Sequence, residues 1–215
     1  VLKIGDQIME PLMLHRGMQR RAAIMEAIQL LNGVGINNAE ARVQDYPHQL
    51  SGGMRQRVMI AMALACSPDF LIADEPTTAL DVTIQAQILT LIDRLQEEMG
   101  LALLLITHDL GIVAQRADTV HVMYAGSILE TAPAARLVES PMHPYTKGLL
   151  ASLPENSIPG MPLKAIPGHP PDLSRTLEGC PFQERCEEKM DPCAGKMPTV
   201  HSLSPNHHVA CWKYL

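Results

Sequence analysis

Two apolar runs of strand length lie on either side of one amphipathic stretch, and this order restricts the fold more than any other feature. The runs are Phe70–Ala73 and Leu101–Ile106, and a helix is expected over Val82–Met99, where Gly100 would end it. The apolar face of that helix comprises Ile84, Ile88, Leu91, Leu95 and Met99. A helix between two unbroken apolar strands is typical of a βαβ unit in a parallel sheet that is buried on both faces. The sequence therefore predicts an α/β protein in which helices flank a parallel sheet.

A glycine pair opens another predicted helix upstream of the first strand. The stretch reads LSGGMRQR over residues 50–57, and an apolar face continues beyond it to Ala65. The N-terminus of a helix offers unpaired backbone N–H groups to an anion. Because Gly52 and Gly53 have no Cβ, the backbone there can approach a phosphate closely. We therefore predict an anion-binding turn at the start of this helix.

Two carboxylates follow the first strand. Asp74 and Glu75 stand at its carboxyl end, where ligands bind in open α/β sheets. Carboxylates in this position are suited to hold Mg²⁺ and to activate water beside a phosphate. Since successive strand residues point to opposite faces, the two side chains can have different roles. Together with the glycine pair they predict a nucleotide-hydrolysing site.

Composition argues against several classes of function. The 215 residues suffice for one substantial core and a small appendage. A net charge of −6 without a basic stripe, and an aromatic content of 3%, argue against a nucleic-acid partner. The longest apolar run, Leu101–Ile106, is far shorter than the roughly 18 residues that suggest a membrane span. We recognise no signal peptide.

The stretches LSGGMRQR and LIADEPTTALD resemble the signature motif, the Walker B strand and the D-loop of the ATP-binding-cassette (ABC) ATPases. His108, directly after the second strand, is similar to the switch histidine of that family. The resemblance implies a P-loop NTPase-type fold that uses ATP and Mg²⁺. It implies that Asp74 holds Mg²⁺ through water, that Glu75 is the catalytic base, and that catalytic His108 contacts the γ-phosphate. The implied cofactor-binding residues are Ser51, Gly52, Gly53, Gln56, Asp74 and Asp81.

The phosphate-binding Walker A loop of this family, G-x-x-x-x-G-K-[ST], is missing, and the chain opens with Val1. We expect a chain that is truncated at its N-terminus, and a degenerate protein that never bound ATP is the alternative. In the family, two ATPase subunits close head to tail around two nucleotides. The resemblance therefore implies that Ser51 and Gly53 grip the nucleotide of the partner subunit. These 215 residues alone are expected not to hydrolyse ATP.

From about residue 140 the composition changes. Proline and glycine become frequent between Pro154 and Pro171, which predicts an extended, loop-rich tail with little regular structure. Four of the five cysteines then follow in this tail: Cys180, Cys186, Cys193 and Cys211. The fifth, Cys66, lies on the signature helix and is expected to be a small buried residue.

The clustered cysteines allow several interpretations. Disulfides would suit a secreted domain, whereas a nucleotide-hydrolysing site implies the reducing cytosol. Structural zinc usually takes closer C-x-x-C pairs, while a four-cysteine iron–sulfur cluster tolerates wider spacing. Unmetallated thiols, and metal ligation by His207 or His208 near Cys211, also remain open.

Four further stretches, HPYT, PGHPPDL, GCPFQERC and HVACW, resemble the tail of the oligopeptide and dipeptide permease ATPases, which holds a [4Fe-4S] cluster in some members. The resemblance implies such a cluster here, with Zn²⁺ as the alternative, on Cys180, Cys186, Cys193 and Cys211. It also implies three parts. These are a helical subdomain that ends in the signature helix (1–66), a catalytic α/β core (67–140) and a cysteine-containing C-terminal extension (141–215).

The same resemblance implies the ATPase subunit of a bacterial importer that couples ATP hydrolysis to uptake of oligopeptides or dipeptides. Its expected partners are a second ATPase subunit, with a paralogue favoured, two transmembrane permease subunits, and a periplasmic or extracellular peptide-binding protein. Its expected location is peripheral, at the cytoplasmic face of the inner (plasma) membrane. A non-transport ABC ATPase and a non-catalytic, metal-binding regulatory module are the alternatives. The sequence does not identify the transported substrate.

Overall fold

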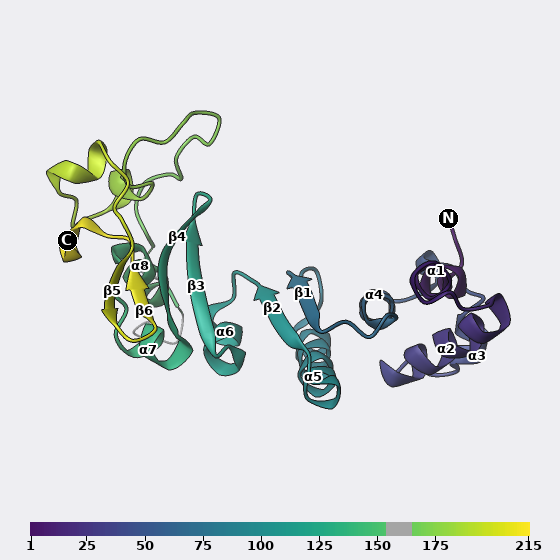
Figure 1. Cartoon of the computed structure of the whole chain (residues 1–215). Coiled ribbons are helices and arrows are strands. Elements are labelled where there is room, and N and C mark those ends of the chain that lie inside the picture. Colours follow the sequence, from purple (N-terminus) through teal and green to yellow (C-terminus); the bar gives the residue numbers. More distant parts are fainter. Residues whose placement is uncertain (154–164) are drawn as a thin grey trace. The chain divides into compact units, whose positions relative to one another are not determined.

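The computed structural model describes residues 1–153 and 165–215, and the chain divides into two compact units (Figure 1). The first unit spans Val1–His108 and the second spans Asp109–Leu215, and each is described by itself. The predicted loop-rich stretch from Pro154 to Pro162 lies outside the described residues. The part boundaries proposed after residues 66 and 140 stay a prediction. Among the described residues, no helix combines the length and the apolar character needed to cross a membrane.

Helices make up the first part of the first unit. They are α1 (Ile4–Arg16), α2 (Arg20–Gly33), α3 (Ala39–Arg42) and α4 (Gly52–Leu64), with a 3-10 turn at Pro47–Gln49. Apolar side chains from these helices share one core with α5 (Val82–Met99). This core includes Ile4, Ile8, Leu12, Leu31, Ala61 and Ile88, each with no exposed surface.

Cys66 does not join this core, so the prediction that it is buried was wrong. Helix α4 ends at Leu64, which leaves Cys66 beyond the last turn with an exposed side chain. Its sulfur lies 3.6 Å from the Pro11 carbonyl oxygen.

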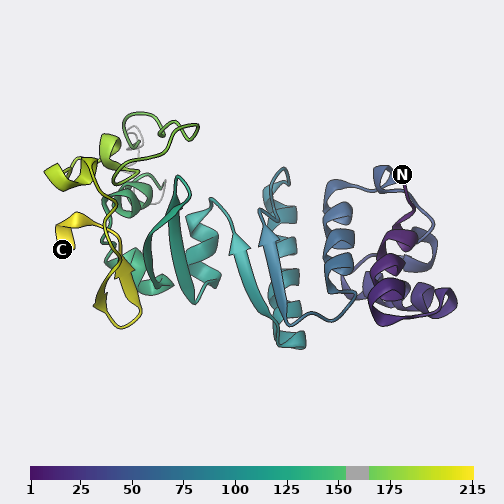
Figure 2. The same ribbon diagram turned by 45° about the horizontal axis from the view of Figure 1, so that its top comes forward.

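The predicted βαβ unit is present. Strands β1 (Phe70–Asp74) and β2 (Ala102–Ile106) pair in parallel, with Phe70 opposite Ala102 and Asp74 opposite Ile106. Helix α5 connects them and lies along one face of the pair (Figure 2). Its ends follow ordinary capping chemistry, because Asp81 accepts a hydrogen bond from Ile84 N and Gly100 takes the left-handed conformation.

The other face of the β1–β2 pair is open, which corrects the prediction that these strands are buried on both faces. Phe70 and Ile72 are 52% and 59% exposed, and Leu104 and Ile106 are 41% and 45% exposed. Alternate residues of a strand share a face, and Ile72 is the register partner of Leu104. An unbroken apolar run indicates a strand suited to burial on two faces, but the described residues cover only one of them.

The second unit is built on an antiparallel sheet with the strand order β3-β4-β6-β5. Two of its strands, β3 (Thr119–Tyr124) and β4 (Ser127–Pro133), form a hairpin. Ala125 and Gly126 form its turn, both with positive φ, as a two-residue hairpin loop of type I′ requires. The helices of this unit are α6 (Leu110–Arg116), α7 (Ala134–Glu139) and α8 (Pro144–Ala151).

The cysteine tail contains more regular structure than the sequence predicted. Strands β5 (His201–Ser204) and β6 (His207–Val209) form a hairpin, and β6 joins the sheet beside β4. Asn206 turns this hairpin with φ of 64°, a conformation that asparagine tolerates better than most residues. Within residues 165–215 there are also 3-10 turns at Gln183–Arg185, Asp191–Ala194 and Trp212–Tyr214.

Candidate functional site

The ends of the two parallel strands bring Glu75 and His108 together. Glu75 follows β1 and donates its backbone N–H to the Ile106 carbonyl, at 2.9 Å, on the neighbouring strand. His108 follows β2, and its Nδ1 lies 3.0 Å from Glu75 Oε1. The Thr78 hydroxyl donates to the other carboxylate oxygen at 2.6 Å. The parallel register thus places a carboxylate and an imidazole in direct contact at one edge of the sheet.

Glu75 is held in an unusual backbone conformation and in its charged form. Its φ is +44°, a left-handed value that is uncommon for a residue with a Cβ. Such conformations cost roughly 1–3 kcal/mol and cluster at functional sites. The hydrogen bonds from Thr78 and then from His108 lower the pKa of the Glu75 carboxyl. The side chain remains 44% exposed, so an ionised carboxylate is presented to solvent.

Asp74 ends β1 with an exposed side chain. It precedes Glu75 directly, but the chain turns between them because Glu75 leaves the extended conformation. The two carboxylates are therefore adjacent in sequence, but only Asp74 belongs to the extended strand. A role for Asp74 toward Mg²⁺ stays a prediction.

The signature residues form the start of α4. Ser51 is the N-cap, and its hydroxyl accepts a hydrogen bond from Met54 N at 3.3 Å. Gln56 lies half-buried one turn further along the helix. The backbone N–H groups at the N-terminus of α4 are of the type that binds an anion, and their contact with a nucleotide stays a prediction.

Packing within this chain requires a glycine at position 53 and brings position 52 into ordinary contact with Leu80. A Cβ on Gly53 would lie 2.7 Å from Ile84 Cγ2, and a Cβ on Gly52 would lie 3.4 Å from Leu80 Cδ2. Ile84 is the same residue whose N–H is capped by Asp81. The signature turn and the D-loop therefore touch through Ile84. Sequence reasoning missed this contact because the spacing of the motifs does not reveal which side chains meet.

The four tail cysteines gather in the second unit without disulfides. Cys180 and Cys193 are buried, Cys186 and Cys211 are half-buried, and Cys180 N donates to the Cys193 carbonyl at 2.8 Å. Burial, followed by the effect of the other thiols, raises the pKa of Cys180 to about 11. Cys180 and Cys193 belong to one cluster of buried side chains, and Cys186 and Trp212, the neighbour of Cys211, pack against it. The four cysteines therefore lie in one part of the second unit.

The backbone supports three of these thiols directly. The N–H groups of Phe182, Glu188 and Lys213 bond to the sulfurs of Cys180, Cys186 and Cys211, each two residues earlier. Burial raises the pKa of Cys186 and Cys211 as it does that of Cys180, and these backbone hydrogen bonds oppose that rise without cancelling it. Residues 1–153 and 165–215 nevertheless contain no group of three or more Cys, His, Asp or Glu side chains arranged to hold a metal ion. The thiols are gathered, but they do not surround one point.

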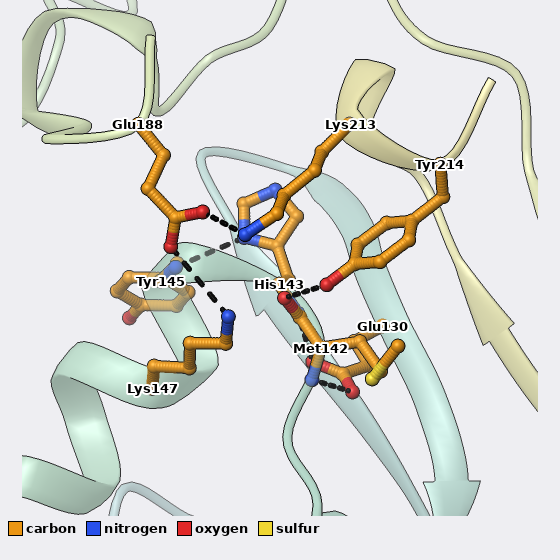
Figure 3. Close-up of polar contacts among 8 residues, drawn as sticks. All are labelled: Glu130, Met142, His143, Tyr145, Lys147, Glu188, Lys213 and Tyr214. Atoms are coloured by element: carbon orange, nitrogen blue, oxygen red, sulfur yellow. Dashed lines mark hydrogen bonds and ion pairs between the residues drawn. The ribbon is translucent and has the colours of Figure 1, made fainter.

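A buried glutamate organises the surroundings of the HPYT motif (Figure 3). Glu130 is 1% exposed and accepts hydrogen bonds from the N–H groups of Met142 and His143, at 2.8 and 2.9 Å. Its Oε1 also lies 2.8 Å from Nε2 of His207, which is 3% exposed. His207 is therefore engaged by a carboxylate, and its use as a metal ligand has no support in this geometry. The signal that could have revealed Glu130 is one acidic residue within an otherwise apolar strand.

Comparison with known proteins identifies the family. A model described as ABC transporter matches residues 3–78, and one described as oligopeptide/dipeptide transporter, C-terminal region, matches residues 129–193. The chain is 50% identical over 212 residues to the oligopeptide transport ATP-binding protein OppD of Salmonella typhimurium. It is 51% identical over 211 residues to the dipeptide transport ATP-binding protein DppD of Bacillus subtilis. The chain belongs to the oligopeptide/dipeptide branch of the ABC transporter family.

These alignments cover nearly all of this chain but not all of its relatives. They include 99% of the chain with OppD and 98% with DppD, while the chain spans 63% of the length of each relative. Among solved structures, an inward-facing metal-chelate type ABC transporter matches with a TM-score of 0.58 and 20% identity. That match covers 69% of this chain and 57% of the other, and it supports the predicted α/β fold.

The two matched regions of this ABC transporter family member contain most of the predicted site residues. The first region includes the signature turn, Asp74 and Glu75. The second begins at β4 and ends at Cys193, so it includes Glu130, the HPYT motif and three of the four clustered cysteines. Asp81, His108 and Cys211 lie outside both regions.

Proposed function

We propose that this chain is the ATP-binding and ATP-hydrolysing subunit of an ABC importer that takes up oligopeptides or dipeptides. The contact between Glu75 and His108 at the ends of adjacent parallel strands is the observation that carries the proposal. The identity to OppD and DppD, whose names refer to oligopeptide and dipeptide transport, supports the substrate class. The match to the C-terminal region of oligopeptide/dipeptide transporters supports it independently.

In this proposal the charged Glu75 carboxylate accepts a proton from, or orients, the water that attacks the γ-phosphate. His108 and Thr78 fix that carboxylate by their hydrogen bonds, so its reactive geometry is set before the nucleotide arrives. Asp74 would hold Mg²⁺, and the ion would supply positive charge to offset that of the phosphates of ATP. The turn at Ser51, Gly52 and Gly53 offers N–H groups to a nucleotide held by the partner subunit.

Gln56 and Asp81 flank the signature contact through Ile84. Asp81 is fixed as the cap of α5, so its carboxylate is held at the start of that helix. Both side chains are proposed to complete the surface that meets the second nucleotide-binding subunit. Rigid placement at a helix terminus suits a residue that must be in position before the two subunits close.

The partners and location follow from the same family. We propose a second ATPase subunit, with a paralogue favoured, two transmembrane permease subunits, and a periplasmic or extracellular peptide-binding protein. The chain would then lie peripherally at the cytoplasmic face of a bacterial inner (plasma) membrane. Co-purification of these subunits with the chain from native membranes tests this assignment, and recovery of the chain without any permease subunit would refute it.

The hydrolytic role of Glu75 is tested by Glu75→Gln in the transporter purified from its native membrane. Loss of the carboxylate base is expected to lower ATP turnover by about 100-fold or more, while ATP binding is retained. Glu97→Gln is the matched control, because Glu97 is an exposed glutamate on α5. Turnover by phosphate release and binding by nucleotide retention give the two readouts. Wild-type turnover in Glu75→Gln would rule out the assignment of this residue.

We further propose that Cys180, Cys186, Cys193 and Cys211 hold a [4Fe-4S] cluster, with Zn²⁺ as the alternative. The gathering of four free cysteines in one part of the second unit supports this proposal, and the thiols would have to move closer to one point to hold the cluster. A bound cluster would supply a cross-link between these segments of the tail.

Metal and acid-labile sulfide analysis of anaerobically purified protein distinguishes these alternatives. A visible chromophore with iron and sulfide, lost in Cys186→Ser and retained in Cys66→Ser, is the expected result. Cys66 is a suitable control because it belongs to the first unit and is not one of the four clustered cysteines. A folded protein with neither iron nor zinc would refute the proposal.

A further inference from the structure

Two of the cysteine loops share one local design. In Cys186-Glu187-Glu188 and in Cys211-Trp212-Lys213, the backbone N–H of the third residue bonds to the sulfur of the first. The side chains of these third residues, Glu188 and Lys213, then form an ion pair with each other (Figure 3). One charged contact therefore joins the two residues that support the two sulfurs.

We propose that the Glu188–Lys213 ion pair is a positioning device that holds Cys211 beside Cys186. This inference rests on the proposed role of the four cysteines as one ligand group. Of the four, Cys211 is the most distant in sequence, and it lies just beyond Val209, the last residue of β6. Its placement relative to the other cysteines therefore depends on contacts made by the residues around it.

The other contacts of this segment hold it to different places. Trp212 Nε1 donates to the Lys196 carbonyl at 2.9 Å, and Tyr214 Oη donates to the Met142 carbonyl at 3.1 Å. Neither reaches the loop that carries Cys186. The Lys213 side chain does reach it, because its partner Glu188 lies two residues after Cys186.

Glu188 also has a second cationic neighbour, which provides a control within the same chain. Lys147 Nζ lies 3.5 Å from Glu188 Oε1, but Lys147 belongs to α8, which carries no cysteine (Figure 3). Substitution of Lys147 removes one positive charge beside the Glu188 carboxylate and keeps the Glu188–Lys213 contact between the two cysteine loops. Removing Lys213 takes the same charge and separates the loops. The two substitutions therefore distinguish positioning from a general charge effect.

The test compares Lys213→Met with Lys147→Met by the alkylation rate of each cysteine in reduced, chelator-treated protein, followed by mass spectrometry. Loss of one partly exposed ion pair is expected to raise the rate at Cys211 by about fivefold in Lys213→Met, through easier local opening. Lys147→Met is expected to match the wild type. The doubly substituted protein Glu188→Lys/Lys213→Glu is expected to regain slow alkylation, because it restores the pair.

Metal retention is a second readout, and it distinguishes failure of this inference from failure of the cofactor proposal. Retention of iron and sulfide, or of zinc, is measured in the same variants during challenge with a chelator. Faster alkylation in Lys213→Met in a chain that never holds metal would support the positioning role and refute the ligand-group proposal. Equal alkylation and equal metal retention in Lys213→Met and wild type would overturn the positioning role. If Lys213→Met fails to fold, fast alkylation of Cys211 in the folded charge-swapped protein would overturn it instead.

Discussion

His143 is a histidine that the fold keeps neutral. It is 1% exposed, and burial lowers its pKa to about 4 despite the opposing charges of Glu130 and Glu188. Its Nδ1 accepts a hydrogen bond from Tyr145 N at 3.0 Å and so caps α8 (Figure 3). Because that bond requires an unprotonated Nδ1, the neutral ring is part of the cap.

The lowered pKa of His143 predicts a loss of stability in mild acid. Between pH 6.5 and about 4 the unfolded chain binds a proton at this ring and the folded chain does not. The free energy of unfolding therefore falls as the pH falls through this window, by up to about 3 kcal/mol, and this residue adds no further loss below it. Urea unfolding at several pH values measures the slope.

His143→Asn is the matched variant for this measurement. The asparagine side-chain oxygen can accept the same N–H bond and does not titrate, so the cap is kept and the proton is removed. The variant should show a flatter dependence of stability on pH between 6.5 and 4. An unchanged slope would mean that other groups produce the acid sensitivity.

Among the secondary-structure elements, α4 and α5 pack closely because Gly53 of α4 has no side chain where it meets Ile84 of α5. Gly53→Ala would place a Cβ 2.7 Å from Ile84 Cγ2, which is closer than side-chain atoms pack. We expect it to lower the free energy of unfolding by about 1–3 kcal/mol, as overpacking does. Gly33→Ala, at the end of α2 with no atom within 4 Å of the new Cβ, should leave stability equal or slightly higher. Chemical denaturation of both variants measures the difference, and equal effects would exclude the close contact.

Helices and strands with a clear apolar pattern were predictable from the sequence, whereas the segments that pack against them or pair with them were not. The 3.6-residue period of α5 and the apolar runs of β1 and β2 gave the βαβ unit, since both signals are local. Burial of β1 depended on what covers each face, and the β5–β6 hairpin depended on pairing with β4. Of the candidate site, motif order predicted that Glu75 and His108 each follow one of the two strands, and the structure adds their direct contact. The Glu130 network was missed because it joins segments that are distant in sequence.

At the scale of the whole molecule, one face of the β1–β2 pair is open. The same isoleucine-to-alanine substitution is therefore expected to cost different amounts of stability on β1 and on α5. Ile72 is 59% exposed, whereas Ile88 on α5 has no exposed surface. We expect Ile88→Ala to cost about 2–5 kcal/mol of unfolding free energy and Ile72→Ala to cost about 1 kcal/mol or less. Calorimetric or urea unfolding of the two variants gives the comparison. A similar cost for both would mean that the Ile72 face is covered in the folded protein.

The sheet of the second unit also has a consequence for the time course of folding. Strand β4 meets β3 across a two-residue turn, but it meets β6 through residues as far apart as Glu130 and His207, which are separated by 77 positions. Closing a short turn is fast and costs little entropy, while closing a long segment is slower. We therefore expect the β3–β4 hairpin to form early and β6 to add late. The cysteines would then be reactive for longest in the newly made chain, before β6 and the Cys211 segment that follows it join the sheet.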